Sequence, residues 1–390
     1  MKLKSDTKVN NTISSETGDD RLHLKYQDKE YNESYKRWRL KNKDSLGFFF
    51  AENPNRLTYQ DNVGFINDYP EVQEEKTMRR VIAVLGIVLI FRSFFDIFSA
   101  YILPNLLQDL GMNIHYDFFT GKLYGDDTLV LTVKFISEML SMLLSIGILI
   151  RLIRMPFRIM LPLKVTNTPM FRASVPVMLL VCGVCSIMST VYEQILSLAK
   201  ISTERSMLFP ESVPDFIYMV ITQILIIPAV SELCSRGVIL QFTRQFGDGA
   251  ALLITSFITA ALYRDITQFC FAFIAAVSIG YFTIRTGSVI TAVIMRITMN
   301  LYVYILYFLD YKLDSDMLVM LFIFSNIIIG IIFTIYFLYN HSDCFGMKLS
   351  SRYMSFGKKM LAFFTSTPII IWLTTVFIVT IFNINFNFIE

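Results

Sequence analysis

Apolar residues occur in long runs along most of this chain, separated by short polar loops. Several of the runs reach the roughly 20 residues that an α-helix needs to cross a hydrocarbon core about 30 Å thick. The pattern therefore predicts an all-α, polytopic transmembrane helical bundle. It indicates about eight or nine spans, near 81–103, 128–150, 174–197, 214–240, 250–264, 267–284, 288–309, 317–340 and 361–386.

Two of these runs, 250–264 and 267–284, are short and almost adjacent in the sequence. A tight hairpin or a partly re-entrant pair is therefore an alternative to two full crossings. The segment 1–75 differs from the rest, because it is polar and carries too few apolar positions to form a core. We expect a disordered tail at 1–75, N-terminal transmembrane helices at 76–200, a core at 201–310 and C-terminal transmembrane helices at 311–390.

Composition agrees with a membrane protein. The 390 residues are 54% hydrophobic and only 17% charged, against roughly 25% charged residues in soluble domains. The mean hydropathy is +0.51. The net charge of +3 is small and lies in loops instead of forming a basic stripe, which argues against a nucleic-acid partner. Membrane lipid is the partner that composition predicts.

The charges of the loops predict an orientation. The segment 151–173 has five basic residues and no acidic one, whereas 104–127 and 310–316 are mainly acidic. By the positive-inside rule, the N-terminus is then cytosolic. Frequent Ile, Phe, Asn, Lys and Tyr fit an AT-rich bacterial genome, so a bacterial plasma membrane is the expected location.

Ionisable residues inside the predicted spans are informative, because each costs at least ~2.5 kcal/mol at mid-membrane unless it has a partner or water. In the first span Arg92 precedes Asp96 by four residues, and in the second Lys134 precedes Glu138 by four. This spacing places both members on one helix face. We expect these four residues to serve the structure, either as self-neutralised local pairs or as ties between helices.

A denser polar cluster is predicted in the second half of the chain. Glu232 and Arg236 are one helical turn apart, and so are Arg296 and Asn300, while Arg264 ends another apolar run. Counted from the predicted helix ends, Glu232 and Arg296 lie about two turns from the cytosolic side, and Arg264 lies deeper unless its helix tilts. Three helices would therefore bring polar side chains together inside the membrane.

At these residues the sequence resembles the CPBP family, which contains the CAAX prenyl endopeptidases and bacteriocin-processing enzymes. The first motif of the family is Glu-Glu-x-x-x-Arg, and here it reads Ser231-Glu232-Leu-Cys-Ser-Arg236. Gly280 and the tripeptide Thr-Gly-Ser at 286–288 match further landmarks of the family. The resemblance covers about 214–305.

The second and third family motifs, Phe-x-x-x-His and His-x-x-x-Asn, align with segments that end at Arg264 and Asn300, the latter beginning at Arg296. The resemblance implies an intramembrane protease core in which glutamates and histidines activate water for peptide hydrolysis, with or without a divalent metal. The retained family positions, Glu232, Arg236 and Asn300, are the candidate catalytic residues. Ser231, Arg264 and Arg296, which replace the first glutamate and both histidines, are candidate binding residues.

These replacements change the chemistry that the resemblance implies. A guanidinium group stays protonated and offers no lone pair, so it neither accepts a proton nor binds a metal. Glu232 and Asn300 alone do not supply the ligands of a zinc site. We therefore expect no metal and no other cofactor. Whether the chain is an enzyme stays open at this point, with the residues favouring an inactive protein.

Three functions remain in view. The first is a pseudoprotease whose polar cavity binds an anionic peptide or protein C-terminus or a lipid, or whose Glu232 only ties Arg236, Arg264 and Arg296 together in a structural network. The second is an active endopeptidase, of the CAAX type or for bacteriocin processing and self-immunity, with Glu232 as the base and an arginine stabilising the oxyanion. The third is a small-solute transporter, which the buried charges alone suggest.

Overall fold

The structure is a computed structural model of the whole chain. It describes residues 24–43, 45–50, 57–60, 64–67, 70–117, 123–198, 201–202, 210, 212–341, 353–382 and 385–386. Residues 1–23 of the predicted tail lie outside this part.

Long apolar helices make up most of the described residues, which confirms the predicted helical polytopic bundle. Seven helical segments there are long and apolar enough to cross a membrane, and an eighth is present if α15 (Phe356–Phe364) and α16 (Thr367–Phe382), bent by 64°, form one span. The seven are α3 (Pro70–Asp109), α4 (Asp127–Ile153), α6 (Thr168–Leu198), the segment Val213–Phe246, α11 (Ile266–Thr286), α12 (Val289–Tyr311) and α13 (Asp316–Asn340).

The predicted span at 250–264 is shorter in the structure than a crossing requires. Helix α10 (Asp248–Ala261) has 14 residues, or about 21 Å at 1.5 Å per residue. It packs against α11. Residues next to both ends of the hairpin bind the N-terminal segment: Gln245 Nε2 donates to Leu46 O, and Gln27 Nε2 donates to Gly287 O. The pair is therefore a helical hairpin in which α11 is long enough to cross a membrane and α10 is not.

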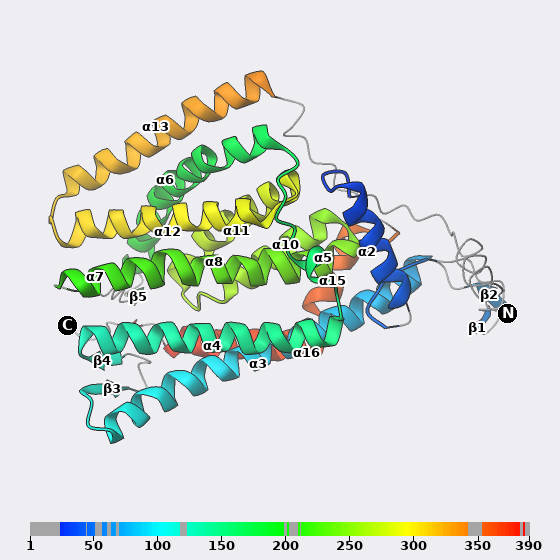
Figure 1. The fold of residues 1–390 in the computed structure, drawn as a ribbon, viewed down its shortest axis with the longest axis horizontal. Helices are drawn as coiled ribbons and strands as arrows, with labels where there is room; N and C mark the ends of the chain where they lie inside the picture. The colour runs from blue at the N-terminus through cyan, green and yellow to red at the C-terminus, as the bar shows by residue number, and fades with distance from the viewer. Residues whose placement is uncertain are drawn as a thin grey trace, which may run out of the picture.

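The segment Val213–Phe246 lies at the centre of the bundle. It consists of α7 (Val213–Met219), the π-helix η1 (Val220–Ile226), α8 (Ile227–Glu232), the π-helix η2 (Leu233–Ile239), α9 (Leu240–Thr243) and the 3-10 helix η3 (Arg244–Phe246). On one side α3, α4 and α16 pack together, and on the other α6 packs with α11, α12 and α13 (Figure 1). Helix α8 contacts α4 and α12, so the central segment joins the two groups.

Side-chain caps begin several of these helices where the sequence supplies Ser or Asp. The Ser212 side chain accepts from Asp215 N at the start of α7, and Ser288 accepts from Ile290 N at the start of α12. Such caps satisfy backbone amides that have no partner within the helix. The short α5 (Phe157–Met160) lies in the loop before α6.

The structure differs from the predicted disorder in the N-terminal segment. Helix α2 (Lys29–Lys41) packs its Tyr31, Tyr35 and Trp38 side chains into the main core at one end of the bundle (Figure 1). These three residues follow the i, i+4, i+7 spacing of one helical face. The polar composition averaged over 1–75 hides this short apolar face, and that is why composition alone predicts a tail without structure.

The N-terminal segment also binds polar groups at the ends of the spanning helices. Tyr35 Oη donates to Gln241 O at 2.8 Å, and Trp38 Nε1 donates to Ile153 O at 3.1 Å. Gln245 donates to Leu46 O at 3.0 Å. These bonds satisfy helix-end carbonyls and a glutamine side chain that are buried away from water.

Three two-stranded antiparallel sheets accompany the helices. β1 (Leu57–Gln60) pairs with β2 (Gly64–Asn67), β3 (Ile114–Tyr116) pairs with β4 (Leu123–Gly125), and β5 (Ile201–Ser202) pairs with β6 (Asn385–Phe386). In the second sheet Ile114 is opposite Gly125. The β3–β4 and β5–β6 sheets lie at the end of the bundle opposite to α2 (Figure 1).

Candidate functional site

The centre of the candidate site is Glu232, the last residue of α8. It lies well inside the segment Val213–Phe246, far from both ends of this span. The following turn is the π-helix η2, a form that occurs mostly as single turns inside α-helices and often at functional sites. Its wider turn carries Arg236, so the local backbone presents a carboxylate and a guanidinium to the same interior region.

Glu232 is bound by two arginines. Its Oε2 atom lies 3.2 Å from Arg236 Nε, and its Oε1 atom lies 3.9 Å from Arg296 Nε. The Glu232 side chain is only 1% exposed. Each carboxylate oxygen therefore faces a guanidinium group at ion-pair distance, Oε2 more closely than Oε1.

Arg236 is buried and has several further partners. Its Nη1 donates to Ser235 Oγ at 2.8 Å and to Thr259 Oγ1 at 2.9 Å, while Nη2 donates to Ala276 O at 2.9 Å. These acceptors lie on η2, α10 and α11. Arg236 therefore links the central span to the α10–α11 hairpin, and its donors are largely used by the fold itself.

Helix α12 contributes Arg296 and Asn300. The Arg296 guanidinium lies over the Tyr263 ring, with Cζ 5.3 Å from the ring centroid, and its side chain is 12% exposed. Asn300 Nδ2 donates to Gln223 O in the π-helix η1 at 3.2 Å. Arg296 is thus a less enclosed cation than Arg236, whereas the Asn300 amide binds the backbone of the neighbouring span.

Arg264 has a different ion-pair partner from the one that we expected. Glu232 binds Arg236 and Arg296, but Arg264 Nη1 lies 2.6 Å from Oδ2 of Asp96 on α3. The reason is its position in the turn between α10 and α11, where the backbone has a left-handed φ of 52°. This turn points the side chain toward the first span.

The structure also places Ser231, an expected binding residue, and Asp265, the residue that follows Arg264. The Ser231 hydroxyl donates to Pro228 O at 2.9 Å, within its own helix. Asp265, next to Arg264, accepts from the amide and the hydroxyl of Thr267 and caps α11. Asp265 therefore starts a helix and does not enter the ion pairs of Glu232.

Helix α3 adds a charged residue to the cluster. Its Asp96 pairs with Arg264 in the turn between α10 and α11, which is one of the ties between helices that we considered from the sequence. Among the described residues no ion pair joins Arg92 to Asp96 or Lys134 to Glu138, so the local pairs are absent there. Similar depth in neighbouring spans is the sequence signal that indicates this larger cluster.

The donor set does not fit the divalent metal that the resemblance implies. The positions of the two family histidines hold Arg264 and Arg296, which have no lone pair to offer a metal. Glu232 is engaged by Arg236 and Arg296. Within the described part of the chain, no group of three or more His, Cys, Asp or Glu side chains is arranged to hold a metal ion. We derive no chemical step through a metal here.

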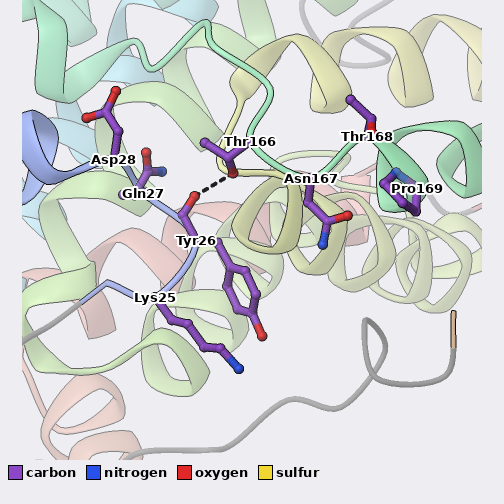
Figure 2. A pocket seen from close by; sticks show the side chains of 8 residues that line it. All are labelled: Lys25, Tyr26, Gln27, Asp28, Thr166, Asn167, Thr168 and Pro169. Carbon is purple, nitrogen blue, oxygen red and sulfur yellow. Dashed lines mark hydrogen bonds between the residues drawn. The ribbon is translucent and has the colours of Figure 1, made fainter.

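A pocket of about 520 Å³ lies at the end of the bundle, away from the charged cluster, between the N-terminal segment and the loop before α6. Thr166 Oγ1 donates to Tyr26 O at 2.7 Å across it (Figure 2). Tyr26 also contacts the Arg285 guanidinium, whose Cζ lies 4.2 Å from the ring centroid. The pocket is therefore formed by the same contacts that hold the N-terminal segment in place.

The fold and the buried charged site together define a polytopic integral membrane protein with an intramembrane polar site. Comparison with known families identifies the region that holds it: residues 213–302 match the family model described as Type II CAAX prenyl endopeptidase Rce1-like. This region is Rce1-like and confirms the resemblance to the CPBP family. It contains Glu232, Arg236, Arg264, Arg296 and Asn300. No curated protein and no solved structure matches the chain.

Proposed function

We propose that this protein is a catalytically inactive relative of the CAAX prenyl endopeptidases that binds the anionic end of a peptide or a lipid within the membrane. The observation that carries the proposal is that Glu232, the retained acid, is bound by two guanidinium groups. The positions where the family has histidines hold two cations, Arg264 and Arg296. The site has therefore exchanged proton acceptors for anion-binding groups.

The geometry supports anion binding better than hydrolysis. Hydrolysis requires a group that takes a proton from water within about 2.6–3.2 Å. Both Glu232 oxygens are opposite arginines, so that group is not available without breaking an ion pair. Arg264 and Arg296, with side chains 15% and 12% exposed, are the cations that an incoming anion can reach. Guanidinium groups bind carboxylate and phosphate through paired hydrogen bonds.

We also propose that the membrane is a bacterial plasma membrane and that the α2 end of the bundle faces the cytosol. Exposed basic residues between the end of α4 and α5 support it, because basic residues concentrate on the cytosolic side. They are Arg151, Arg154 and Arg158. No metal or other cofactor takes part in the proposed activity.

The first test measures hydrolysis. Purified full-length protein is incubated with a prenylated peptide that ends in a CAAX sequence, with wild type and Glu232→Gln side by side. We expect no cleavage above background by either protein. Cleavage by the wild type that is lost in Glu232→Gln would show that the endopeptidase alternative is correct.

The second test measures binding and uses a matched pair of peptides, one with a free C-terminal carboxylate and one amidated. We expect the carboxylate form to bind more tightly, and Arg264→Ala and Arg296→Ala to remove the difference while both variants still fold. Arg151→Ala, an exposed arginine of α4, is the control for net charge. If both site variants unfold, and the milder Arg264→Gln and Arg296→Gln fold and still bind normally, the arginines are structural and the proposal is wrong.

A further inference from the structure

The ion pair between Arg264 and Asp96 differs in burial from the pair at the centre of the site. Arg264 Nη1 lies 2.6 Å from Asp96 Oδ2, and the two side chains are 15% and 29% exposed. The Arg236 and Glu232 side chains, in contrast, are 0% and 1% exposed. A partly exposed pair is easier to break than a buried one, because its separated charges can still be solvated. The Arg264–Asp96 pair is therefore the one that an incoming group can open.

The two partners of this pair belong to different groups of helices. Arg264 lies in the turn that leads into α11, and α11 packs against α6, α10 and α12. Asp96 lies on α3, which packs against α4, α15 and α16 and is outside the matched region 213–302. The pair thus joins two groups that each have their own packing. Opening it would leave the helix contacts within each group in place.

The ion pairs of the site leave one positive charge without a counter-charge. They join three guanidinium groups to two carboxylates, so the excess is one positive charge. Net charge inside a membrane is unfavourable, so the site favours one further anion. Of the two partly exposed guanidinium groups, however, that of Arg264 already binds a carboxylate of the protein itself.

The site is closed on the side of the N-terminal segment. Gln241 Nε2 donates to Arg236 O at 3.1 Å, and Gln241 Oε1 accepts from Tyr31 Oη of α2 at 2.8 Å. Tyr35 Oη of the same helix donates to the Gln241 carbonyl. All four residues are buried. The exposed edge of the site is therefore at Arg264 and Asp96, and not beneath α2.

We infer that Asp96 is an autoinhibitory carboxylate, which occupies the Arg264 guanidinium until the anionic group of a ligand takes its place. The inference rests on the proposed function and specifies how the same site is regulated. A carboxylate of the protein and a carboxylate of a ligand bind a guanidinium group through the same charge-assisted hydrogen bonds. The two therefore compete for Arg264, and a ligand has to break the Arg264–Asp96 pair before it binds there.

The test measures the affinity of the full-length protein in detergent for the carboxylate peptide and for its amidated form. We expect Asp96→Asn to bind the carboxylate peptide about tenfold more tightly than the wild type, which corresponds to 1.4 kcal/mol, and to bind the amidated peptide unchanged. Asp96→Glu keeps the carboxylate and should stay close to the wild type. Asp109→Asn, an exposed change of equal charge on α3, should have no effect. Weaker or unchanged binding of the carboxylate peptide by Asp96→Asn would overturn the inference.

A second measurement separates competition for Arg264 from long-range repulsion of the ligand by Asp96. In an Arg264→Gln background there is no guanidinium group to compete for, so Asp96→Asn should no longer change the affinity. A gain of the same size in both backgrounds would show that Asp96 acts through its charge alone, and the inference would be wrong. If Asp96→Asn does not fold, Asp96→Ser removes the same carboxylate and takes its place in both measurements. If neither folds, Asp96 is structural and the inference is wrong.

The outcomes also distinguish this inference from the proposed function. If the wild type prefers the carboxylate peptide through Arg264 and Arg296, but Asp96→Asn binds it no more tightly, the proposed function stands and the inference is wrong. If only Asp96→Asn distinguishes the two peptides, Asp96 blocks the site completely and both stand. If neither protein distinguishes them, both are wrong. If Tyr31→Phe tightens binding and Asp96→Asn does not, the N-terminal segment is the inhibitory element instead of Asp96.

Discussion

Arg264 Nη1 lies 2.6 Å from Oδ2 of Asp96 and joins the turn of the α10–α11 hairpin to the first spanning helix. One partner lies inside the Rce1-like region and the other lies outside it. The contact therefore connects the core to a helix whose sequence shows no resemblance to the family. The contact also holds the Arg264 guanidinium near the site, with its charge balanced by the Asp96 carboxylate.

This pair predicts a coupling between the two residues. Asp96→Asn leaves Arg264 without its carboxylate partner, and we expect it to lower the free energy of unfolding by about 1–2 kcal/mol, less than the 3–5 kcal/mol of a fully buried pair because both groups are partly exposed. Arg264→Gln should have a similar effect. In the double variant the two losses should not add, which thermal unfolding in detergent can measure as a coupling energy. Additive losses would show that the pair contributes no interaction.

Arg236 is expected to serve the fold more than a ligand. Its guanidinium group is buried and bonds to Glu232, Ser235, Thr259 and the Ala276 carbonyl. Arg236→Met removes these bonds and leaves Glu232 with the more distant Arg296 alone, so we expect a loss of about 3–5 kcal/mol in unfolding free energy. The thermal unfolding midpoint and the yield of folded protein should both fall. A stable Arg236→Met protein that only lost ligand binding would contradict this role.

The helical bundle was predictable because about 20 apolar residues in a row have few alternatives to a spanning helix. The core motifs also indicated that Glu232, Arg236 and Arg296 would come together. The partner of Arg264 was not predictable, because it depends on a left-handed turn and on how α3 packs against the hairpin. For Arg92, Asp96, Lys134 and Glu138 the sequence left local pairs and ties between helices open for the same reason: sequence spacing shows neighbours along a helix but not neighbours across it.

The N-terminal segment shows a different limit. A polar average over 1–75 predicted disorder, whereas Tyr31, Tyr35 and Trp38 form a short apolar face on α2. Their partners, such as Gln241 and Ile153, are distant in the sequence. The surface that binds this face is formed by residues from several helix ends, so no local sequence pattern predicts it. The contacts of α2 become apparent only in the three-dimensional structure.

Gly287, the glycine of the Thr-Gly-Ser landmark, should be sensitive to substitution for two reasons. Its φ is +71°, and an added Cβ would lie 2.3 Å from Tyr26 O. We expect Gly287→Ala to destabilise the fold by more than the about 1 kcal/mol that left-handed strain alone produces, because the N-terminal segment must also move. Gly111, with φ +83° and nothing within 4 Å of an added Cβ, is the matched control for strain. Equal losses in unfolding midpoint for the two alanine variants would show that the contact with Tyr26 is unimportant.

Tyr31 provides a prediction that depends on pH, because it lies outside the spanning segments. Its hydroxyl lies 2.8 Å from Gln241 Oε1 and is buried, and burial raises its pKa far above the usual value. Below about pH 10 the tyrosine is neutral in both the folded and the unfolded chain, so its contribution to stability is complete. Above about pH 10 the unfolded form loses its proton while the folded form keeps it, and stability falls as pH rises.

Tyr31→Phe should therefore have opposite consequences in the two pH ranges. At pH 8 the variant loses one hydrogen bond and should be less stable by about 1 kcal/mol. At pH 11 the wild type has lost about 1.4 kcal/mol through the ionisation of its unfolded state, so the difference should vanish or reverse. Unfolding midpoints of the two proteins at both pH values provide the measurement. Tyr339→Phe, which changes a side chain that is 89% exposed, is the control, and its difference in unfolding midpoint from the wild type should be the same at pH 8 and pH 11. If the difference for Tyr31→Phe is also the same at both pH values, the buried hydroxyl is not coupled to folding.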